Sequence, residues 1–460
     1  MTAIAAGGAR AARPAGADLR RPDLRDAAFM THRAWWLVGL HLLVPGGAQV
    51  VAGSRRLGRF ALAVWLLLWL AAAVAVVLWF VLPGLLLTLP TTGPGLTVLQ
   101  VLLAAWAIFW LVLTLDTLRL ARVVRLRPAA RPAVTVVLAL ALVIGSGGTA
   151  WGAYLAGVAR GTIGHVFGGT RYALPAGGRY NVLLLGGDAG AGRLGLRPDS
   201  ISVVSVDAIT GATTMIGLPR DLDEIPFAKG SPMRTLYPQG YGTDNHCDVD
   251  VCMLNSIYTE AELYKRSLYP HAAAAHSSPG IEATREAVEG ALGIHIQYYL
   301  LVDMGAMEHL IDALGGVTVH VRQRLPIGGG VTANGTLTGV HAWIEKGTHH
   351  LNGNRALWYA RSRHSTSDYD RMRRQRELET ALLKQASPAT VLLKFEAITK
   401  AGSAAVKTDI PQGLLGEFTG LAVKARSAKI HTLELTPPTV PHPSHPDYAA
   451  IHRLVKTALR

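Results

Sequence analysis

Two aspartates stand at the ends of neighbouring apolar runs, where they could share a metal ion. Asp188 follows the run at residues 180–185, and Asp199 directly precedes the β-branched run at 201–206. If both runs are strands of one sheet, the two carboxylates meet at the same edge and can bind a hard cation such as Mg²⁺, with a phosphate completing its shell. Aspartates at strand ends are also common in turns and caps, so this spacing alone is weak evidence for a metal site.

A glycine-rich string lies between these aspartates. Residues 190–195 read Gly-Ala-Gly-Arg-Leu-Gly, which matches the dinucleotide-binding pattern G-x-G-x-x-G. That pattern must open a helix whose N-terminus faces the pyrophosphate, whereas Pro198 and the run that follows it lead into another strand. We therefore interpret the string as a flexible loop and exclude a dinucleotide-binding site.

Arginines occupy positions from which a phosphate could be held. Arg197 lies close to Asp199, and the apolar run at 213–218 leads into Pro219, Arg220 and Asp221. Asp221 can hold the guanidinium of Arg220 in place. Arginine suits phosphate because its planar guanidinium donates two parallel hydrogen bonds and keeps its charge.

The densest basic cluster lies at residues 356–375. On a helix, Arg371 and Gln375 are one turn apart and share a face, with Arg374 close to it. A solvated basic helix with acidic partners is the alternative for an arginine-rich run of this kind. The other candidates in the cluster are Arg361 and Arg363.

The runs that must position these residues alternate between strand and helix patterns. Strands are expected at 180–185, 201–206, 213–218, 297–302, 316–321 and 429–435. Helices are expected at 253–265, 281–292, 304–314, 353–362, 369–386 and 388–402, and residues 327–347 form a glycine-rich excursion. The mixture predicts one α/β domain whose central sheet is covered by helices.

The first part of the chain is apolar enough to cross a membrane. Half of the 460 residues are hydrophobic (50%), and most of the excess lies before residue 157. Runs at 60–82, 97–118 and 133–156 have about the ~20 residues that a spanning helix needs. Pro45, Gly46 and Gly47 interrupt a further apolar stretch at 35–53, which we interpret as a re-entrant or interfacial hairpin.

The arginines between these segments predict their orientation. They crowd the N-terminal tail and the joints at 54–59 and 119–131, whereas the connection at 82–96 carries no charge. By the positive-inside rule, the uncharged connection is external, the N-terminus is cytoplasmic and the C-terminal domain is extracytoplasmic. If 35–53 were a fourth span, that domain would instead lie in the cytoplasm.

A net charge of +14 is typical of nucleic-acid-binding proteins. Here many of the arginines flank apolar segments, so we interpret them as topology signals that face anionic lipid. An external domain also meets no genome. We therefore exclude nucleic acid as a partner.

The two cysteines, Cys247 and Cys252, both lie in the predicted external part. In an oxidising compartment such a pair predicts a disulfide that closes a small loop. A metal site in the run at 247–252 is the weaker alternative, because thiolates and carboxylates are ligands of different hardness.

Taken in order, these pieces resemble the LytR-CpsA-Psr family of cell-envelope phosphotransferases. The resemblance extends from about residue 180 to 405, and each piece is weak alone while the full order is specific. The matching strings are Asn181-Val182-Leu183-Leu184-Leu185-Gly186 with Asp188, Arg197-Pro198-Asp199-Ser200, Leu218-Pro219-Arg220-Asp221, Leu254-Asn255-Ser256-Ile257-Tyr258, Leu314-Gly315-Gly316-Val317, Tyr359-Ala360-Arg361-Ser362-Arg363 and Arg371-Met372-Arg373-Arg374-Gln375.

The resemblance implies an α/β/α fold with a central mixed sheet and an apolar groove that holds a polyprenyl chain. It implies that Asp188 and Asp199 hold Mg²⁺, with Mn²⁺ as an alternative, on a pyrophosphate at the mouth of that groove. Other residues would clamp the pyrophosphate oxygens: Arg220, Arg361, Arg371 and Gln375, with Arg197, Arg363 and Arg374 nearby.

The implied activity is transfer of a glycopolymer from a polyprenyl-pyrophosphate carrier to peptidoglycan, with release of polyprenyl phosphate. Positioning and charge neutralisation suffice for such chemistry, and no general base is evident. The alternatives are hydrolysis of the same pyrophosphate and a non-catalytic envelope regulator. Relatives with one span are common, so the additional membrane segments here suggest a membrane-embedded partner.

These interpretations divide the chain into five parts. The arginine-rich tail is 1–33, the transmembrane region is 34–156, and a glycine-rich linker follows at 157–179. The catalytic domain is expected at 180–436. A Pro/His-rich tail with a short helix at 437–460 has no assigned role.

Overall fold

The chain consists of two units, each with its own internal packing. The computed structural model describes residues 19–20, 22–81, 92–188, 197–243, 246–331, 336–362, 367–385, 406–428 and 430–460. One unit comprises Met1–Leu86 and Pro94–Gly157, and the other comprises Leu87–Gly93 and Val158–Arg460. We describe the two units separately.

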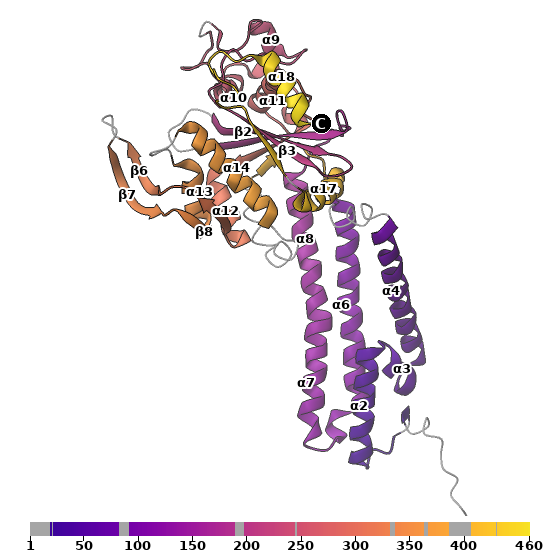
Figure 1. Cartoon of the computed structure of the whole chain (residues 1–460). Helices are drawn as coiled ribbons and strands as arrows, with labels where there is room; N and C mark the ends of the chain where they lie inside the picture. Colours follow the sequence, from indigo (N-terminus) through magenta and orange to yellow (C-terminus); the bar gives the residue numbers. More distant parts are fainter. Residues whose placement is uncertain are drawn as a thin grey trace, which may run out of the picture. The chain divides into compact units, whose positions relative to one another are not determined.

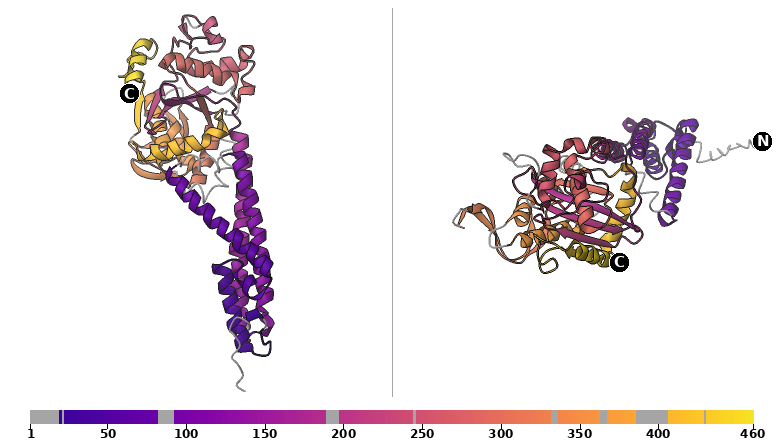
Figure 2. Two further views of the ribbon diagram at one scale, coloured as in Figure 1. Left: turned by 90° about the vertical axis from the view of Figure 1, so that its right-hand side faces the viewer. Right: turned by 90° about the horizontal axis from the view of Figure 1, so that it is seen from above.

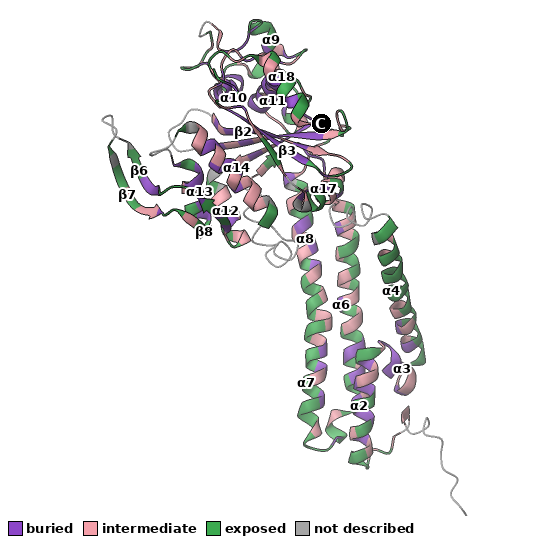
Figure 3. Cartoon of the chain, in the orientation of Figure 1, coloured by how far each residue is buried: buried purple, intermediate pink, exposed green. Residues whose placement is uncertain are grey.

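The first unit is helical and holds most of the residues in the segments long and apolar enough to cross a membrane: Arg55–Leu78, Gly93–Arg125 and Ala130–Gly164. Gly93 and residues 158–164 belong to the second unit. Only 6%, 17% and 17% of the most apolar windows of these three segments are buried in the protein, so most of these side chains point outward (Figure 3). Such a surface is suited to lipid. The helices involved are α4 (Arg55–Val81), α6 (Gly93–Ala121), α7 (Ala130–Leu142) and α8 (Gly148–Val166), with a π-helical turn at Val143–Gly147.

The interrupted stretch at 35–53 folds as two helices joined by a tight turn. They are α2 (Ala27–Leu43) and α3 (Gly47–Ala52), and Gly46 between them has a φ of +96°. A side chain at Gly46 would lie 2.6 Å from Cβ of Ala61, so this turn requires glycine. The amide Nε2 of Gln49 donates to Thr117 Oγ1 and to the carbonyl of Leu113, both at 3.1 Å, which ties α3 to α6.

The second unit is built on a six-stranded mixed sheet with the strand order β10-β3-β2-β1-β4-β9 (Figure 1). Strand β1 is antiparallel to β2 and parallel to β4, while β3 is antiparallel to β2 and parallel to β10. This arrangement confirms the predicted α/β class and the mixed sheet. The strands are β1 (Arg179–Asp188), β2 (Arg197–Asp207), β3 (Thr213–Leu218), β4 (Tyr298–Asp303), β9 (Val406–Thr408) and β10 (His431–Glu434).

Helices cover both faces of this sheet, and the alternation of side chains along β1 shows why. Leu183 and Leu185 belong to the main core, whereas Leu184 points to the other face. In Figure 2 the salmon helices and the orange helices lie on opposite sides of the magenta strands. The first set includes α10 (Leu254–Leu263) and α11 (Pro279–Leu292), joined by α18 (Tyr448–Ala458), and the second includes α12 (Met304–Leu314), α13 (Gly353–Arg361) and α14 (Asp368–Gln385).

Three differences from the sequence-based expectations concern element boundaries. The glycine-rich stretch at 327–347 contains an antiparallel pair, β6 (Leu325–Val331) and β7 (Leu337–Ile344), and is therefore not an excursion. A further pair joins β5 (Val317–Val321) to β8 (Gly347–Leu351). Helix α8 continues to Val166, past the expected start of a linker at 157. The helix expected at 388–402 and the glycine-rich string at 190–195 lie outside the described residues.

Candidate active site

A β-bulge at the start of β2 sets the position of Asp199. In the pairing of β1 with β2, Gly186 lies opposite Ser200 and Gly187 lies opposite Pro198, so Asp199 between them has no opposite residue. A bulge of this kind bends the strand and redirects the side chain of the extra residue. Beyond the bulge, Asp188 at the end of β1 lies opposite Arg197. The backbone thus brings Asp188, Arg197 and Asp199 to one edge of the sheet, as the spacing predicted.

Arg220 reaches this edge from the end of β3 and pairs with Asp199. Its Nη1 donates to Oδ1 of Asp199 at 2.7 Å, and each side chain is 24% exposed. The sequence had suggested Asp221 as the residue that holds Arg220. A carboxylate that contacts the guanidinium in the structure is that of Asp199, which the antiparallel pairing of β2 with β3 brings close.

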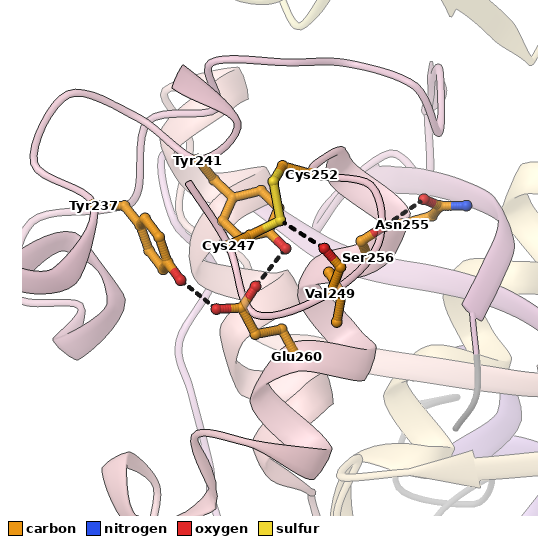
Figure 4. The surroundings of a disulfide bond; sticks show 8 residues. All are labelled: Tyr237, Tyr241, Cys247, Val249, Cys252, Asn255, Ser256 and Glu260. Carbon is orange, nitrogen blue, oxygen red and sulfur yellow. Dashed lines mark hydrogen bonds between the residues drawn. A yellow bond between two sulfur atoms is a disulfide. The ribbon is translucent and has the colours of Figure 1, made fainter. Parts of the chain in front are cut away.

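The backbone of Arg220 is held by the segment that follows the disulfide. The N–H of Asn255 donates to the Arg220 carbonyl at 3.1 Å, and the N–H of Leu254 donates to the Leu222 carbonyl at 3.0 Å. Directly before this segment, Cys247 and Cys252 form a disulfide with their Cα atoms 5.8 Å apart (Figure 4).

A buried carboxylate supports the same region from below the disulfide loop. Glu260 of α10 is fully buried and accepts hydrogen bonds from the hydroxyls of Tyr237 and Tyr241, the latter at 2.6 Å (Figure 4). Burial, reinforced by the hydrogen bond to Glu260, raises the pKa of both tyrosines above their ordinary value. Both hydroxyls therefore stay protonated and keep donating, which fixes the loop that leads to Asn255.

Helix α14 begins with a capping box that places Arg371 in its first turn. The N–H of Asp370 donates to the hydroxyl of Ser367 at 3.1 Å, and the N–H of Ser367 donates back to Asp370 at 3.2 Å. Arg371 is 2% exposed and Gln375, one turn later, is 5% exposed. The solvated basic helix considered from the sequence is therefore excluded for this face of α14.

The arginine-rich cluster divides into residues with different surroundings. Arg361, the last residue of α13, is exposed. Arg374 is buried, and its guanidinium donates to the carbonyls of Tyr359, at 2.8 Å, and of Ser362. These bonds attach α14 to the end of α13, so the structure gives Arg374 a role in packing. Arg363 lies outside the described residues.

Sequence reasoning missed Arg376, which connects α14 to the sheet. It is 3% exposed, and its guanidinium donates to the hydroxyls of Ser202 at 2.8 Å and Ser200 at 3.2 Å. The missed signal was the pair Ser200 and Ser202, two positions apart in a strand whose next residues are mostly apolar. Such a pattern indicates one polar stripe on a buried face, and that stripe needs a buried partner.

An apolar cavity of about 190 Å³ lies between the sheet and the helices α12, α13 and α14. Its polar lining includes Gln375 and Ser200, the neighbour of Asp199. The side-chain oxygen of Gln375 is buried without a hydrogen-bond partner among the described residues. Most of the wall is aliphatic: Leu184, Leu300, Val302, Ile311, Leu357, Leu378 and Leu382. The cavity therefore joins an apolar interior to the edge that carries the charged residues.

The donors at this edge fit a hard cation that shares its ligands with a phosphate. Across the described residues, no group of three or more His, Cys, Asp or Glu side chains is placed to hold a metal ion. A Mg²⁺ ion needs only one or two protein carboxylates when phosphate oxygens and water supply the rest. Asp199 is one carboxylate at this edge, and the backbone places Asp188 at the end of the adjacent strand.

Comparison with known proteins gives one family match. The model of the LytR_cpsA_psr family matches residues 171–443. Biofilm regulatory protein A of Streptococcus mutans is 29% identical over 237 residues, covering 50% of this chain and 50% of that protein. The polyisoprenyl-teichoic acid–peptidoglycan teichoic acid transferase TagV of Bacillus subtilis is 32% identical over 169 residues, covering 35% and 41%. The alignments thus span half or less of these relatives.

Among solved structures, the crystal structure of Bacillus subtilis TagV is 25% identical to this chain. It covers 61% of this chain and 95% of that structure, with a TM-score of 0.43.

Proposed function

The chain belongs to the LytR_cpsA_psr family, and from this premise we propose that it is a membrane-anchored phosphotransferase of the cell envelope. It transfers a glycopolymer from a polyprenyl-pyrophosphate carrier to peptidoglycan and releases polyprenyl phosphate. The similarity to TagV of Bacillus subtilis, which is named as a polyisoprenyl-teichoic acid–peptidoglycan teichoic acid transferase, supports this reaction class.

The observation that carries the proposal is the apolar cavity with its polar end at the edge of Asp199. A polyprenyl pyrophosphate has an apolar chain and a strongly charged head, so its site must combine an aliphatic pocket with a polar mouth. Ser200, Gln375 and Glu379 supply the polar side chains of this lining, and its other residues are apolar. Buried polar atoms normally have partners, so the buried oxygen of Gln375 suggests a ligand group that is absent here.

The charged residues around this mouth are suited to a pyrophosphate. Arg220 follows the end of β3, Arg361 is the last residue of α13 and Arg371 lies in the first turn of α14, so three separate parts of the chain each contribute a guanidinium. Guanidinium groups bind phosphate oxygens in pairs and stay charged. In the resting state, Asp199 neutralises Arg220 and holds its guanidinium in place. Arg374 positions the site by attaching α13 to α14.

The proposal includes a divalent ion on Asp188 and Asp199, with Mg²⁺ as the first choice and Mn²⁺ as the alternative. Such an ion, when bound, neutralises charge on the pyrophosphate oxygens. The Oδ1 atom of Asp199 is bonded to Arg220, so a phosphate that takes over this guanidinium releases the carboxylate for the metal.

The reaction is an exchange at one phosphorus atom. An acceptor hydroxyl oxygen of peptidoglycan bonds to the phosphorus that bears the glycopolymer, and the bond from that phosphorus to the bridging oxygen breaks. The hydroxyl proton leaves to solvent or to the departing polyprenyl phosphate. The arginines stabilise the charge that develops on the transferred group and on the leaving phosphate.

The membrane segments give the proposed enzyme its location. We place the N-terminus in the cytoplasm and residues 157–460 outside. Arginines lie in the N-terminal tail and in the connections at 54–59 and 119–131, whereas the connection at 82–96 is uncharged, and the positive-inside rule assigns the arginine-rich connections to the cytoplasm. The lipid carrier and peptidoglycan then lie on the same side as the site.

The test is a reconstituted reaction with the full-length protein in lipid nanodiscs. A synthetic polyprenyl-pyrophosphate sugar is incubated with Mg²⁺, with and without peptidoglycan, and both polyprenyl phosphate and sugar-bearing peptidoglycan are measured. We expect both products, with the sugar-bearing product only when peptidoglycan is present. Release of polyprenyl phosphate alone would assign a hydrolase, and absence of both products with either metal would overturn the proposal.

A further inference from the structure

A second cavity, separate from the apolar one, lies on the other side of α14. Its volume is about 570 Å³, and its wall includes residues of β5, α14 and β10. Volumes of roughly 300–1,000 Å³ are typical of small-molecule sites. Its lining is rich in hydroxyl, amide and charged groups, including Thr318, Thr380, Gln385 and Thr432.

Helix α14 forms a wall of both cavities with different faces. Gln375, Leu378 and Leu382 line the apolar cavity, whereas Glu377, Thr380 and Lys384 line the second one. The two sets lie on different sides of a helix with 3.6 residues per turn. The second cavity is therefore not an extension of the lipid pocket, and it needs a ligand of different chemistry.

Two polar groups in the wall of this cavity lack hydrogen-bond partners among the described residues. They are Nε of Arg376 and the carboxylate of Glu434, whose two oxygens are both buried and unpartnered. Nε of Arg376 and Oε1 of Glu434 form an ion pair at 3.7 Å, a separation that is too long for a hydrogen bond. The other nitrogens of Arg376 bond to Ser200, Ser202 and Glu379, so this arginine is fixed in place.

A hydroxyl group would satisfy both of these atoms at once. It donates one hydrogen bond, which Glu434 can accept, and it has lone pairs for the N–H of Arg376. An ammonium group can donate to Glu434 but cannot accept from Arg376, and a carboxylate can accept from Arg376 but cannot donate to Glu434. Elsewhere in the lining, the Gln385 amide is already bonded to the Thr318 backbone and His320 Nδ1 to the Thr348 hydroxyl, whereas the hydroxyl of Thr432 suits a further hydroxyl group.

We propose that this second cavity is a saccharide subsite, in which Glu434 and Arg376 bind a sugar hydroxyl. The saccharide can come from either of two sources, the peptidoglycan acceptor or the glycopolymer of the donor. The choice between these two sources rests on the proposed function, whereas the proposal that the cavity binds a sugar does not.

Binding is measured first, without any lipid substrate. The full-length protein in nanodiscs is titrated with the disaccharide of N-acetylglucosamine and N-acetylmuramic acid, and binding is followed by saturation-transfer NMR and calorimetry. We expect saturable binding that Glu434→Gln weakens about tenfold, the loss typical of one hydrogen bond to a charged group. Arg322→Ala, at the exposed rim, should weaken it several-fold and does not disturb the core.

The matched control is Arg324→Ala. Arg322 and Arg324 are 60% and 56% exposed, and each pairs with one glutamate, but only Arg322 lines the cavity. Arg324→Ala should therefore bind the disaccharide like the wild type. Arg371→Lys should also bind the disaccharide normally, because Arg371 belongs to the proposed pyrophosphate clamp. Disaccharide binding can therefore be tested even if the transfer reaction is not observed.

Steady-state transfer kinetics then identify the source of the saccharide. An increase in KM for peptidoglycan alone in Arg322→Ala and Glu434→Gln assigns the acceptor, and an increase in KM for the polyprenyl-linked donor alone assigns the glycopolymer. Absence of saturable disaccharide binding together with unchanged KM values would mean that only water occupies the cavity, and would overturn the proposal. Loss of binding in Arg371→Lys would place the sugar at the pyrophosphate site and would also overturn it.

Discussion

Asp199 and Arg220 form an ion pair across the edge of the central sheet, with Oδ1 and Nη1 separated by 2.7 Å. The pair joins the proposed metal ligand to the proposed phosphate clamp. Each partner can therefore be tested by a substitution that preserves its size but removes one property.

Loss of a carboxylate should be rescued by metal. Asp188→Asn and Asp199→Asn keep the size of the side chain but weaken the binding of a divalent ion. Transfer should therefore fall steeply and should partly recover in excess Mg²⁺. The measurement is transfer from a synthetic polyprenyl-pyrophosphate sugar across a Mg²⁺ titration, with Arg324→Ala as the variant expected to keep wild-type activity. Full activity of both aspartate variants in chelator would rule out the proposed metal site.

Loss of the guanidinium should not be rescued by metal. Arg220→Lys, Arg361→Lys and Arg371→Lys keep the positive charge but lose the paired donors. Arg220→Lys and Arg371→Lys should each reduce transfer by the equivalent of ~2–5 kcal/mol, as when a buried charge-assisted pair is broken. Arg361→Lys should reduce it less, because the side chain of Arg361 is exposed. The same Mg²⁺ titration measures this effect. Recovery of these variants in excess Mg²⁺ would show that charge alone is required and that the clamp is not bidentate.

Gln375→Leu should separate stability from activity. The buried oxygen of Gln375 has no partner among the described residues, and an unsatisfied buried polar atom costs ~1–3 kcal/mol. Leucine removes that cost and extends the aliphatic wall of the cavity, so the melting temperature should stay equal or rise while transfer is lost. Thermal unfolding and the transfer assay are compared on one preparation. A destabilised variant with normal transfer would contradict a ligand-binding role for Gln375.

Removal of the disulfide should affect the site through Asn255. A closed loop of this length stabilises the fold by about 2 kcal/mol in the chain-entropy account. Mass spectrometry without reductant should detect the protein two daltons below the dithiol form. Cys247→Ser with Cys252→Ser should lower the melting temperature and reduce transfer, because the segment that holds the Arg220 backbone is loosened. Two alkylatable thiols in protein from an oxidising host would refute the disulfide.

Glu434→Gln should stabilise the protein in a pH-dependent manner. Burial raises the pKa of the Glu434 carboxyl above its ordinary value; Arg376 opposes this shift and Glu379 adds to it. The ionised carboxylate therefore costs stability at neutral pH, and the cost disappears as the pH falls below the ordinary value for glutamate. The variant should melt higher than the wild type at pH 7.5 and equally at pH 4. A lower melting temperature at pH 7.5 would contradict this direction.

The sequence predicted the strands and helices with strong local patterns but not those built on glycine. Strands β1 to β3 and helices α10 to α12 came within a few residues, because side-chain alternation and helical periodicity are local. The β6–β7 pair was missed because glycines such as Gly328 and Gly329 are more typical of loops than of strands. Both have positive φ, next to the register shift at Ile327 and Gly328, so glycine there serves the hairpin itself.

The candidate site was predicted in its residue types more completely than in its contacts. The order of the motifs along the chain is what predicts the aspartates and arginines as site residues, and their roles stay predictions. Which carboxylate pairs with Arg220 depends on the register of β2 with β3, and that register is not encoded in either strand alone. The hydrogen bond from Arg376 to Ser202 joins residues 174 positions apart, a separation beyond any local pattern.

The bulge at Asp199 has a consequence for chain length. Asp199 lies between Pro198 and Ser200, which face adjacent residues of β1, and side chains alternate strictly between the two faces of a sheet. Deletion of one residue from this stretch would remove the bulge and shift the register of the preceding part of β2 by one residue. The side chain of Arg197 would then point to the opposite face of the sheet. Homologous chains should therefore tolerate exchanges of side chain along β2 but no gap from Pro198 to Ser200. A single-residue gap there would mark a descendant that keeps the fold and has lost the chemistry.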